Sequence, residues 1–176
     1  STNMAMAKSI GLFTAGFVDV LLQEKPTWTI LAGDRGEQLA AAIACSYSYI
    51  PCAHIQAGER SGNIDGVARH AIGKLVHLHF ASNKEAADRL LRLGEQSFRI
   101  HNVGAPQLDE IQQEYIPSLK EINKNLNSTI NENFLLVVQH PVTEKLIFAG
   151  ENTEILFDAL DNFNMQKVII LPNNDA

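Results

Sequence analysis

Short apolar runs alternate with amphipathic stretches along this chain, and this alternation constrains the fold more than any other feature. Each run has four or five residues and ends at a glycine, a proline or a polar turn, which is typical of strands buried on both faces. Repeated strand–helix units with short connections predict an α/β fold, with a parallel sheet and helices on both of its faces. We expect strands at 28–32, 52–55, 77–81, 99–103, 134–138 and 167–171, and helices at 5–24, 36–47, 67–75, 84–93, 107–114 and 150–163.

A polar segment at 116–133 interrupts this order. It contains Pro117, Ser118 and asparagines at 123, 125, 127 and 131, a composition typical of linkers or peripheral helices. A new strand–helix–strand unit follows it, too small to close a sheet by itself. We therefore expect two α/β domains, at 1–125 and 126–176, the second of them present only in part.

Composition excludes several classes of function. The net charge is −6 and no run of Lys or Arg occurs, which argues against a nucleic-acid partner. Cys45 and Cys52 lack the spacing of a zinc site or a redox motif, so we predict no disulfide framework and a cytoplasmic protein. No segment reaches the run of about 18 apolar residues that crosses a bilayer, so no membrane partner is expected.

Polar residues follow the predicted strands, at the sheet edge where open parallel sheets bind ligands. They are Gly33-Asp34-Arg35-Gly36, residues 56–62, Gly104-Ala105-Pro106, Gln139-His140-Pro141 and Pro172-Asn173-Asn174-Asp175. Each has a structural alternative: Asp34 is also a suitable N-cap for the helix at 36, and Glu59 and Asp65 are also typical of solvated loop carboxylates. His140 is suited to proton transfer but is as often structural.

His77 and His79 share one face of a predicted strand, a spacing compatible with a metal. No third ligand lies nearby in the sequence, so packing is the favoured interpretation and no metal site is predicted. Neither a Gly-x-Gly-x-x-Gly sequence nor a P-loop occurs.

The motifs taken in order resemble the hydrolysing UDP-N-acetylglucosamine 2-epimerases, the enzymes of sialic-acid- and legionaminic-acid-type sugar synthesis. The resemblance covers nearly the whole chain and rests on Gly33-Asp34-Arg35, 54–65, 69–75, 103–106, 139–143 and 172–176. It implies a GT-B-like fold, with the nucleotide in the cleft between two Rossmann-like halves. It also implies elimination of UDP across C1–C2, hydration of the glycal and release of the free C2-inverted sugar.

The resemblance also implies roles for single residues. Asp34, Asp65 and His140 match catalytic positions, and Arg35, Arg69 and Asn173 are the expected substrate-binding residues. The reaction calls for acids, bases and stabilisation of the departing pyrophosphate, but for no metal or organic cofactor. The implied partners are a UDP-sugar and further copies of the chain, in a homodimer or higher homo-oligomer.

Two departures from the family pattern stand out. Gln56 replaces a glutamate that is catalytic in many relatives, and Glu59 in the same loop is a candidate substitute. The opening strand with its phosphate loop is expected before Ser1, and the Ser/Gly-rich uridine-diphosphate loop after Ala176. Two alternatives stay open: a GT-B glycosyltransferase, and a catalytically impaired protein that binds or senses sugar nucleotides.

Overall fold

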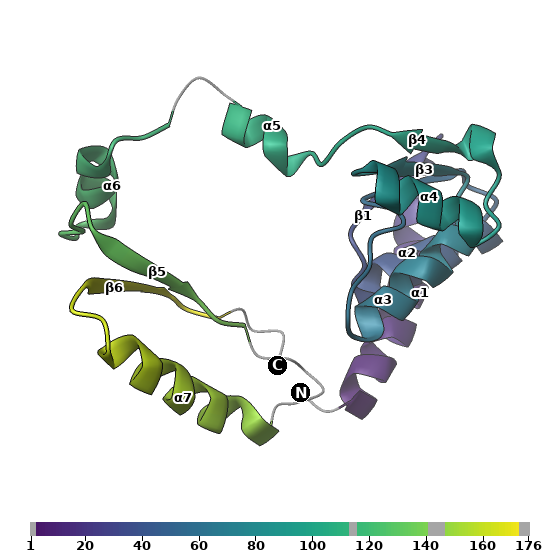
Figure 1. Ribbon diagram of the computed structural model, residues 1–176. Helices are drawn as coiled ribbons and strands as arrows, with labels where there is room; N and C mark the ends of the chain where they lie inside the picture. Colours follow the sequence, from purple (N-terminus) through teal and green to yellow (C-terminus); the bar gives the residue numbers. More distant parts are fainter. Residues whose placement is uncertain (1–2, 113–115, 141–146, 173–176) are drawn as a thin grey trace. The chain divides into compact units, whose positions relative to one another are not determined.

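The computed structural model describes residues 3–112, 116–140 and 147–172. The chain forms two compact units, Ser1–Gln113 and Glu114–Ala176 (Figure 1). The first unit contains the strand ends with most of the predicted site residues.

The first unit is built on a four-stranded sheet in which every neighbouring pair is parallel. The strands run in the order β1-β2-β3-β4. Their bounds are Thr29–Ala32, Cys52–Ile55, Leu78–Ala81 and Ile100–Asn102. The register aligns Leu31 with His54 and His54 with His79, so these three side chains form one row across the sheet. The parallel α/β arrangement predicted from the apolar runs is confirmed.

Five α-helices belong to this unit: α1 (Asn3–Glu24), α2 (Gly36–Tyr47), α3 (Ile64–Leu75), α4 (Lys84–Arg92) and α5 (Gln107–Gln112), with a 3₁₀ turn η1 at Ser97–Arg99. Helix α2 packs between α1 and α3. Its small side chains allow this close packing, since alanines occupy most of its buried positions. The core joins α1, α2 and α3 to β1 and β2 through Leu21, Leu31, Ala41, Ala42, Ala44, Cys45, Cys52, Ile72 and Val76.

Helix α3 begins earlier than predicted, at Ile64 rather than 67. Asn63 is its N-cap, and Asp65 therefore lies in the first helical turn instead of the preceding loop. A carboxylate in that turn interacts favourably with the helix dipole. The first turn of α3 also needs a glycine, because a Cβ on Gly66 would lie 2.5 Å from the carbonyl oxygen of Ser61 in the preceding loop.

Helix α1 corrects one expectation. Its segment Met4–Glu24 has a mean hydropathy of 1.5 over an 18-residue window, so it is long and apolar enough to cross a membrane. The expectation that no segment of the chain is apolar enough to cross a bilayer is wrong. Scattered polar residues interrupt the apolar runs of this helix, but its mean hydropathy still reaches the value of a membrane-spanning segment. Length and composition alone do not place the helix in a membrane, since core helices and signal sequences pass the same test.

The second unit contains α6 (Leu119–Leu126), β5 (Phe134–Val138), α7 (Ala149–Asp161) and β6 (Gln166–Ile170), with β5 and β6 parallel. A capping box between Ser118 and Glu121 starts α6 inside the polar segment. The side chain of Asn123 then bonds both backbone groups of Ile130, at 2.7 and 2.9 Å. Helix α6 is thereby tied to the chain leading into β5.

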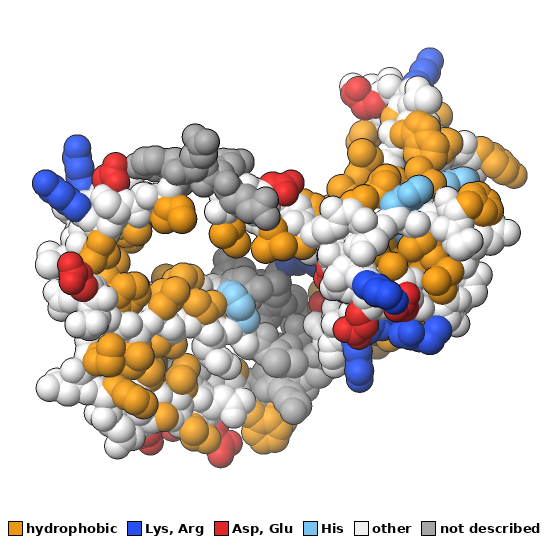
Figure 2. Space-filling view, turned by 45° about the horizontal axis from the view of Figure 1, so that its top comes forward, with side chains coloured by type: hydrophobic (Ala, Val, Ile, Leu, Met, Phe, Trp, Pro, Cys, Tyr) orange, Lys and Arg blue, Asp and Glu red, His pale blue; other side chains and the backbone are white. Residues whose placement is uncertain are grey.

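Large hydrophobic side chains stay exposed on both units (Figure 2). On the edge strand β1 the side chain of Ile30 is 63% exposed, and on β5 that of Leu136 is 59% exposed. Neither unit buries all of its apolar sheet surface.

Candidate functional site

The candidate site lies at the carboxyl ends of β1, β2 and β3. Gly33 and Asp34 follow β1, the loop 56–62 follows β2, and Ser82 follows β3. The β2 loop turns sharply, because Gln56 and Gly58 both have left-handed backbone conformations, with φ of 60° and 78°. A Cβ on Gly58 would lie 2.4 Å from the carbonyl oxygen of Ala86, so only glycine fits there.

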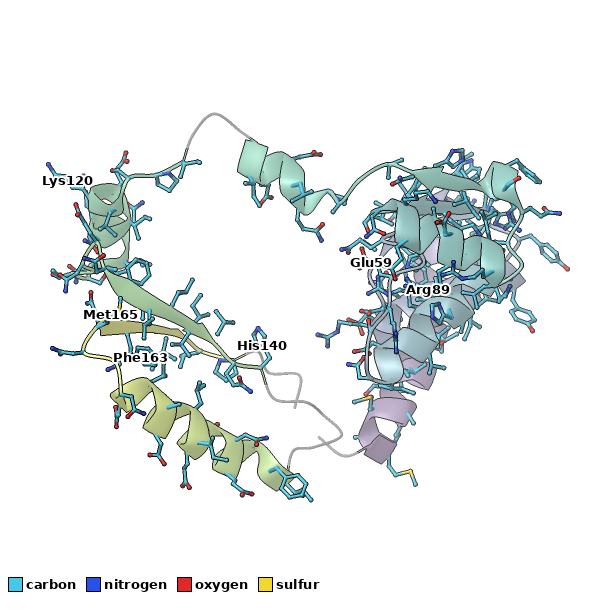
Figure 3. The ribbon with its side chains drawn as sticks, in the orientation of Figure 1. Glu59, Arg89, Lys120, His140, Phe163 and Met165 are labelled. Atoms are coloured by element: carbon cyan, nitrogen blue, oxygen red, sulfur yellow. The ribbon has the colours of Figure 1, made fainter. Side chains whose placement is uncertain are left out.

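Helix α4 holds this loop from the other side. Arg89 donates from Nη1 to the carbonyl oxygen of Gly58 at 2.6 Å. Figure 3 shows Arg89 on α4 and Glu59 on the β2 loop, both within the first unit. The loop is therefore clamped between the sheet and α4.

Arg69, on α3, is the centre of the site. Its side chain is only 7% exposed, and its guanidinium group contacts three acceptors. Nη2 donates to Oδ2 of Asp34 at 2.5 Å, and Nη1 donates to the carbonyl oxygen of Gln56 at 2.6 Å and to Oε2 of Glu59 at 3.2 Å. The planar, multi-donor fork of arginine is well suited to join acceptors from two different loops in this way.

Asp34 is held as a carboxylate. Burial by itself raises its pKa, but hydrogen bonds from Ser61 and Arg69 and the charge of Arg69 outweigh burial, so the pKa lies below its usual value of 3.8. Ser61 donates to Oδ2 at 2.7 Å. The alternative that Asp34 caps α2 is wrong, because the N-cap is Arg35 and the Asp34 carboxylate is engaged by Ser61 and Arg69.

Glu59 is also engaged through both carboxylate oxygens, one by Arg69 and the other by the hydroxyl of Ser82. It is therefore not a freely solvated loop carboxylate. Asp65 accepts a hydrogen bond from the side-chain amide of Asn63 at 2.8 Å. It precedes Arg69 by four residues on α3, which places both side chains on one face of the helix.

His54 was not singled out by sequence reasoning, although it sits on the middle of the site's own strand. It is fully buried, and its Nε2 lies 2.6 Å from the carbonyl oxygen of Gly33. Burial lowers the pKa of His54, and the nearby positive charge of Arg69 lowers it further, against the Gly33 carbonyl, which raises it. The imidazole is therefore neutral near pH 7.

The other two histidines of interest have separate structural contacts. His77 Nδ1 accepts a hydrogen bond from the backbone N–H of Cys52 at 3.3 Å. Buried His79 lies 3.4 Å from Glu95, and its burial lowers its pKa to about 4. Among the described residues, no three His, Cys, Asp or Glu side chains are grouped so that they could hold a metal ion.

The structure thus brings Asp34, Gln56, Glu59 and Arg69 together, and Asp65 lies four residues before Arg69 on α3. Arg35 is 57% exposed and pairs with Glu37 at 2.9 Å. His140 is exposed at the carboxyl end of β5 in the second unit (Figure 3). Asn173 lies outside the described residues.

Sequence reasoning missed Ser82, and it included Ser61 among the strand-end residues 56–62 without giving it a role. Ser82 follows β3 at the same sheet edge, so the rule that singled out Asp34 would have found it as well.

Comparison with known proteins shows which protein family the chain resembles. The family model for UDP-N-acetylglucosamine 2-epimerase matches residues 1–176. The chain belongs to this family. A UDP-N,N'-diacetylbacillosamine 2-epimerase (hydrolyzing) from Legionella pneumophila is 39% identical over 173 residues, which are 98% of this chain and 46% of the relative. A UDP-N-acetylglucosamine 2-epimerase from Neisseria meningitidis is 36% identical over 165 residues, or 93% of this chain and 43% of the relative. The chain thus spans less than half the length of these two epimerases.

Solved epimerase structures share the fold. The Methanocaldococcus jannaschii UDP-GlcNAc 2-epimerase in complex with UDP-GlcNAc and UDP matches with a TM-score of 0.80 at 22% identity, over 96% of this chain and 48% of that one. The Neisseria meningitidis enzyme bound to UDP-GlcNAc matches with a TM-score of 0.76 at 21% identity, over 99% of this chain and 50% of that one. These likenesses confirm the α/β, GT-B-like fold class.

Proposed function

We propose that the full-length protein is a hydrolysing 2-epimerase. It converts UDP-GlcNAc, or a related UDP-diacetamido sugar, into UDP and the free C2-inverted sugar, such as ManNAc. The observation that carries this proposal is the cluster of Asp34, Glu59 and Arg69 at the strand ends of a chain that belongs to the epimerase family. The hydrolyzing relative from Legionella supports the hydrolytic outcome.

The proposed reaction has two stages. A base removes the proton from C2 while the C1–O bond breaks and UDP leaves with the bonding electrons, which gives a 2-acetamidoglucal. Water then adds its oxygen to C1, and C2 receives a proton on the opposite face of the ring. Both stages need groups that hold or accept protons at fixed positions.

The cluster suits part of this chemistry. Asp34 carries no proton near pH 7, because Ser61 and Arg69 keep its pKa below 3.8. It can therefore accept a proton or stabilise positive charge. Asp65 and His140, the other two residues that match catalytic positions, are the candidates for the second proton transfer and for handling the water.

The three substrate-binding candidates are Arg35, Arg69 and Asn173. The question for each is whether it can stabilise the departing pyrophosphate. A departing pyrophosphate carries negative charge, which cationic and amide donors stabilise. Arg69 already pairs with two carboxylates, so we assign it to holding the catalytic loops and leave Arg35, which is exposed, to contact the nucleotide.

Gln56 motivates the second candidate function, a protein that binds sugar nucleotides without turning them over. An amide cannot exchange a proton near neutral pH, and both carboxylate oxygens of Glu59, the candidate substitute, are already engaged by Arg69 and Ser82. The cytoplasmic location and the homo-oligomeric state expected from the sequence stay predictions.

The test is incubation of the full-length protein with UDP-GlcNAc in deuterated water, followed by NMR. We expect free ManNAc with deuterium at C2, released without any sugar acceptor. Binding of UDP with no released sugar would contradict the proposal and favour the binding protein. Sugar transfer only in the presence of an acceptor would favour a glycosyltransferase.

A further inference from the structure

One buried polar group of the first unit has no role in the reaction proposed above. His54 lies inside β2, two residues before Gln56, and its side chain is fully buried. A buried imidazole is costly unless its polar atoms are used. Nε2 contacts the Gly33 carbonyl oxygen at 2.6 Å, whereas Nδ1 has no hydrogen-bond partner in the part of the chain that the structure describes.

The partner determines which nitrogen carries the proton. A carbonyl oxygen only accepts, so Nε2 must donate and Nδ1 is left with its lone pair. The neutral imidazole therefore has a single N–H, and that N–H is used on Gly33.

Gly33 forms a turn with no side chain to anchor it. Its φ is +88°, and the space where a Cβ would stand is open, with no atom within 4 Å. What holds it is hydrogen bonding: its N–H donates to the Ile55 carbonyl at 3.3 Å, and its carbonyl accepts from His54 at 2.6 Å. The shorter of the two bonds comes from the histidine.

The next residue after this turn is Asp34. Its carboxylate must meet both Ser61 and Arg69, at 2.7 and 2.5 Å, which requires the backbone at Gly33 to stay in place. We infer that His54 is a positioning residue, whose Nε2–H bond to the Gly33 carbonyl sets the place of the Asp34 carboxylate. This inference rests on the proposed function for its effect on turnover.

Two substitutions separate the hydrogen bond from the bulk of the side chain. His54→Leu removes the donor and keeps an apolar side chain of similar size. His54→Gln keeps a donor, because the glutamine Nε2 is the same number of bonds from the backbone as the histidine Nε2.

The matched control is His79→Leu. His79 is the direct neighbour of His54 across the sheet and is equally buried, but it faces Glu95 rather than the Asp34 turn. Both leucine variants therefore lose one buried histidine from the same row, and only one of them loses a bond to the catalytic loop.

The experiment uses the full-length protein and measures kcat, KM and the unfolding midpoint of each variant. A displacement of about 1 Å can cost on the order of 100-fold in rate, so we expect His54→Leu to lower kcat by roughly ten- to 100-fold with little change in KM. His54→Gln should recover most of kcat, and His79→Leu should keep it. The inference is overturned if His54→Leu and His79→Leu have the same kcat, or if His54→Gln loses as much as His54→Leu.

A second measurement tests the inference without turnover. If the wild type releases no sugar, the proposed function fails but the positioning role of His54 can still be tested. The Asp34 carboxyl group is then titrated by NMR in protein labelled with ¹³C-aspartate. Its signal is assigned by its loss in Asp34→Asn. We expect His54→Leu to raise the pKa of Asp34 toward its ordinary value, because the contacts with Ser61 and Arg69 weaken. An unchanged pKa in His54→Leu would refute the positioning role.

Discussion

Replacing Arg69 by methionine should destabilise the first unit strongly. The change removes the cation but keeps most of the side-chain bulk. It takes one donor away from each of the two carboxylates and from the Gln56 carbonyl, which leaves the carboxylates only their serine contacts. Breaking a buried ion pair by removing one partner costs about 3–5 kcal/mol. The side chains of Asp34 and Glu59 keep 19% and 28% exposure, so some solvation survives and we expect the lower end, about 3 kcal/mol.

The assay is urea unfolding of the 176-residue chain, followed by the fluorescence of Trp28, its one tryptophan. Trp28 packs edge-on against His77 in the same unit as Arg69, so its emission reports on that unit. With urea m-values of about 1–3 kcal/mol per M, a loss of about 3 kcal/mol lowers the midpoint by roughly 1–3 M.

The control is Lys84→Met, which removes an ion pair of similar length from the surface. Lys84 contacts Asp88 at 2.6 Å, and the two side chains are 83% and 40% exposed. Such exposed helical pairs contribute about 0.3–0.5 kcal/mol. If Arg69→Met unfolds at the same urea concentration as Lys84→Met, the three contacts of Arg69 do not hold the site together and the reasoning is refuted.

Three further outcomes are expected. Gln56→Glu should raise kcat of the full-length protein by about tenfold or more, since general acid–base groups typically contribute 10²–10⁴-fold; an unchanged kcat would show that another group does this work. Gly58→Ala should cost about 1–3 kcal/mol through its positive φ and its clash with Ala86, whereas Gly62→Ala, with open space around it, should be nearly neutral in the same unfolding assay. Asp34 has a folded-state pKa below its unfolded value, so its stabilisation is present above about pH 4 and is lost as pH falls through the folded pKa. Unfolding titrations should therefore show a steeper acid loss in the wild type than in Asp34→Asn, and equal slopes would contradict this sign.

Much of the fold could be predicted because its signals are local. The strands β2 and β5 have the predicted ends, since each is a short, mainly apolar run between turn residues. The start of α3 could not be predicted, because Gly62 and Gly66 suggest a loop and because the N-cap role of Asn63 depends on its backbone conformation.

Some members of the site could be predicted from the sequence, but the contacts between them could not. Asp34 and Glu59 stand out at strand ends, and motif resemblance adds Arg69. That Arg69 joins them depends on contacts across 35 and 10 residues, which no periodicity encodes. In the sequence, His54 has the pattern of an ordinary strand residue. Its proposed importance comes from its contact with the carbonyl oxygen of Gly33, which follows the neighbouring strand β1.

The left-handed backbone at Gln56 also limits what evolution can place there. A β-branched residue at φ of 60° is strongly disfavoured, whereas unbranched polar residues are tolerated more easily. The Gln56 carbonyl, rather than its side chain, holds the turn by accepting from Arg69. Amide and acid can therefore be exchanged at this position without rebuilding the loop, so one substitution can alter the chemistry of the site while the scaffold around it stays the same.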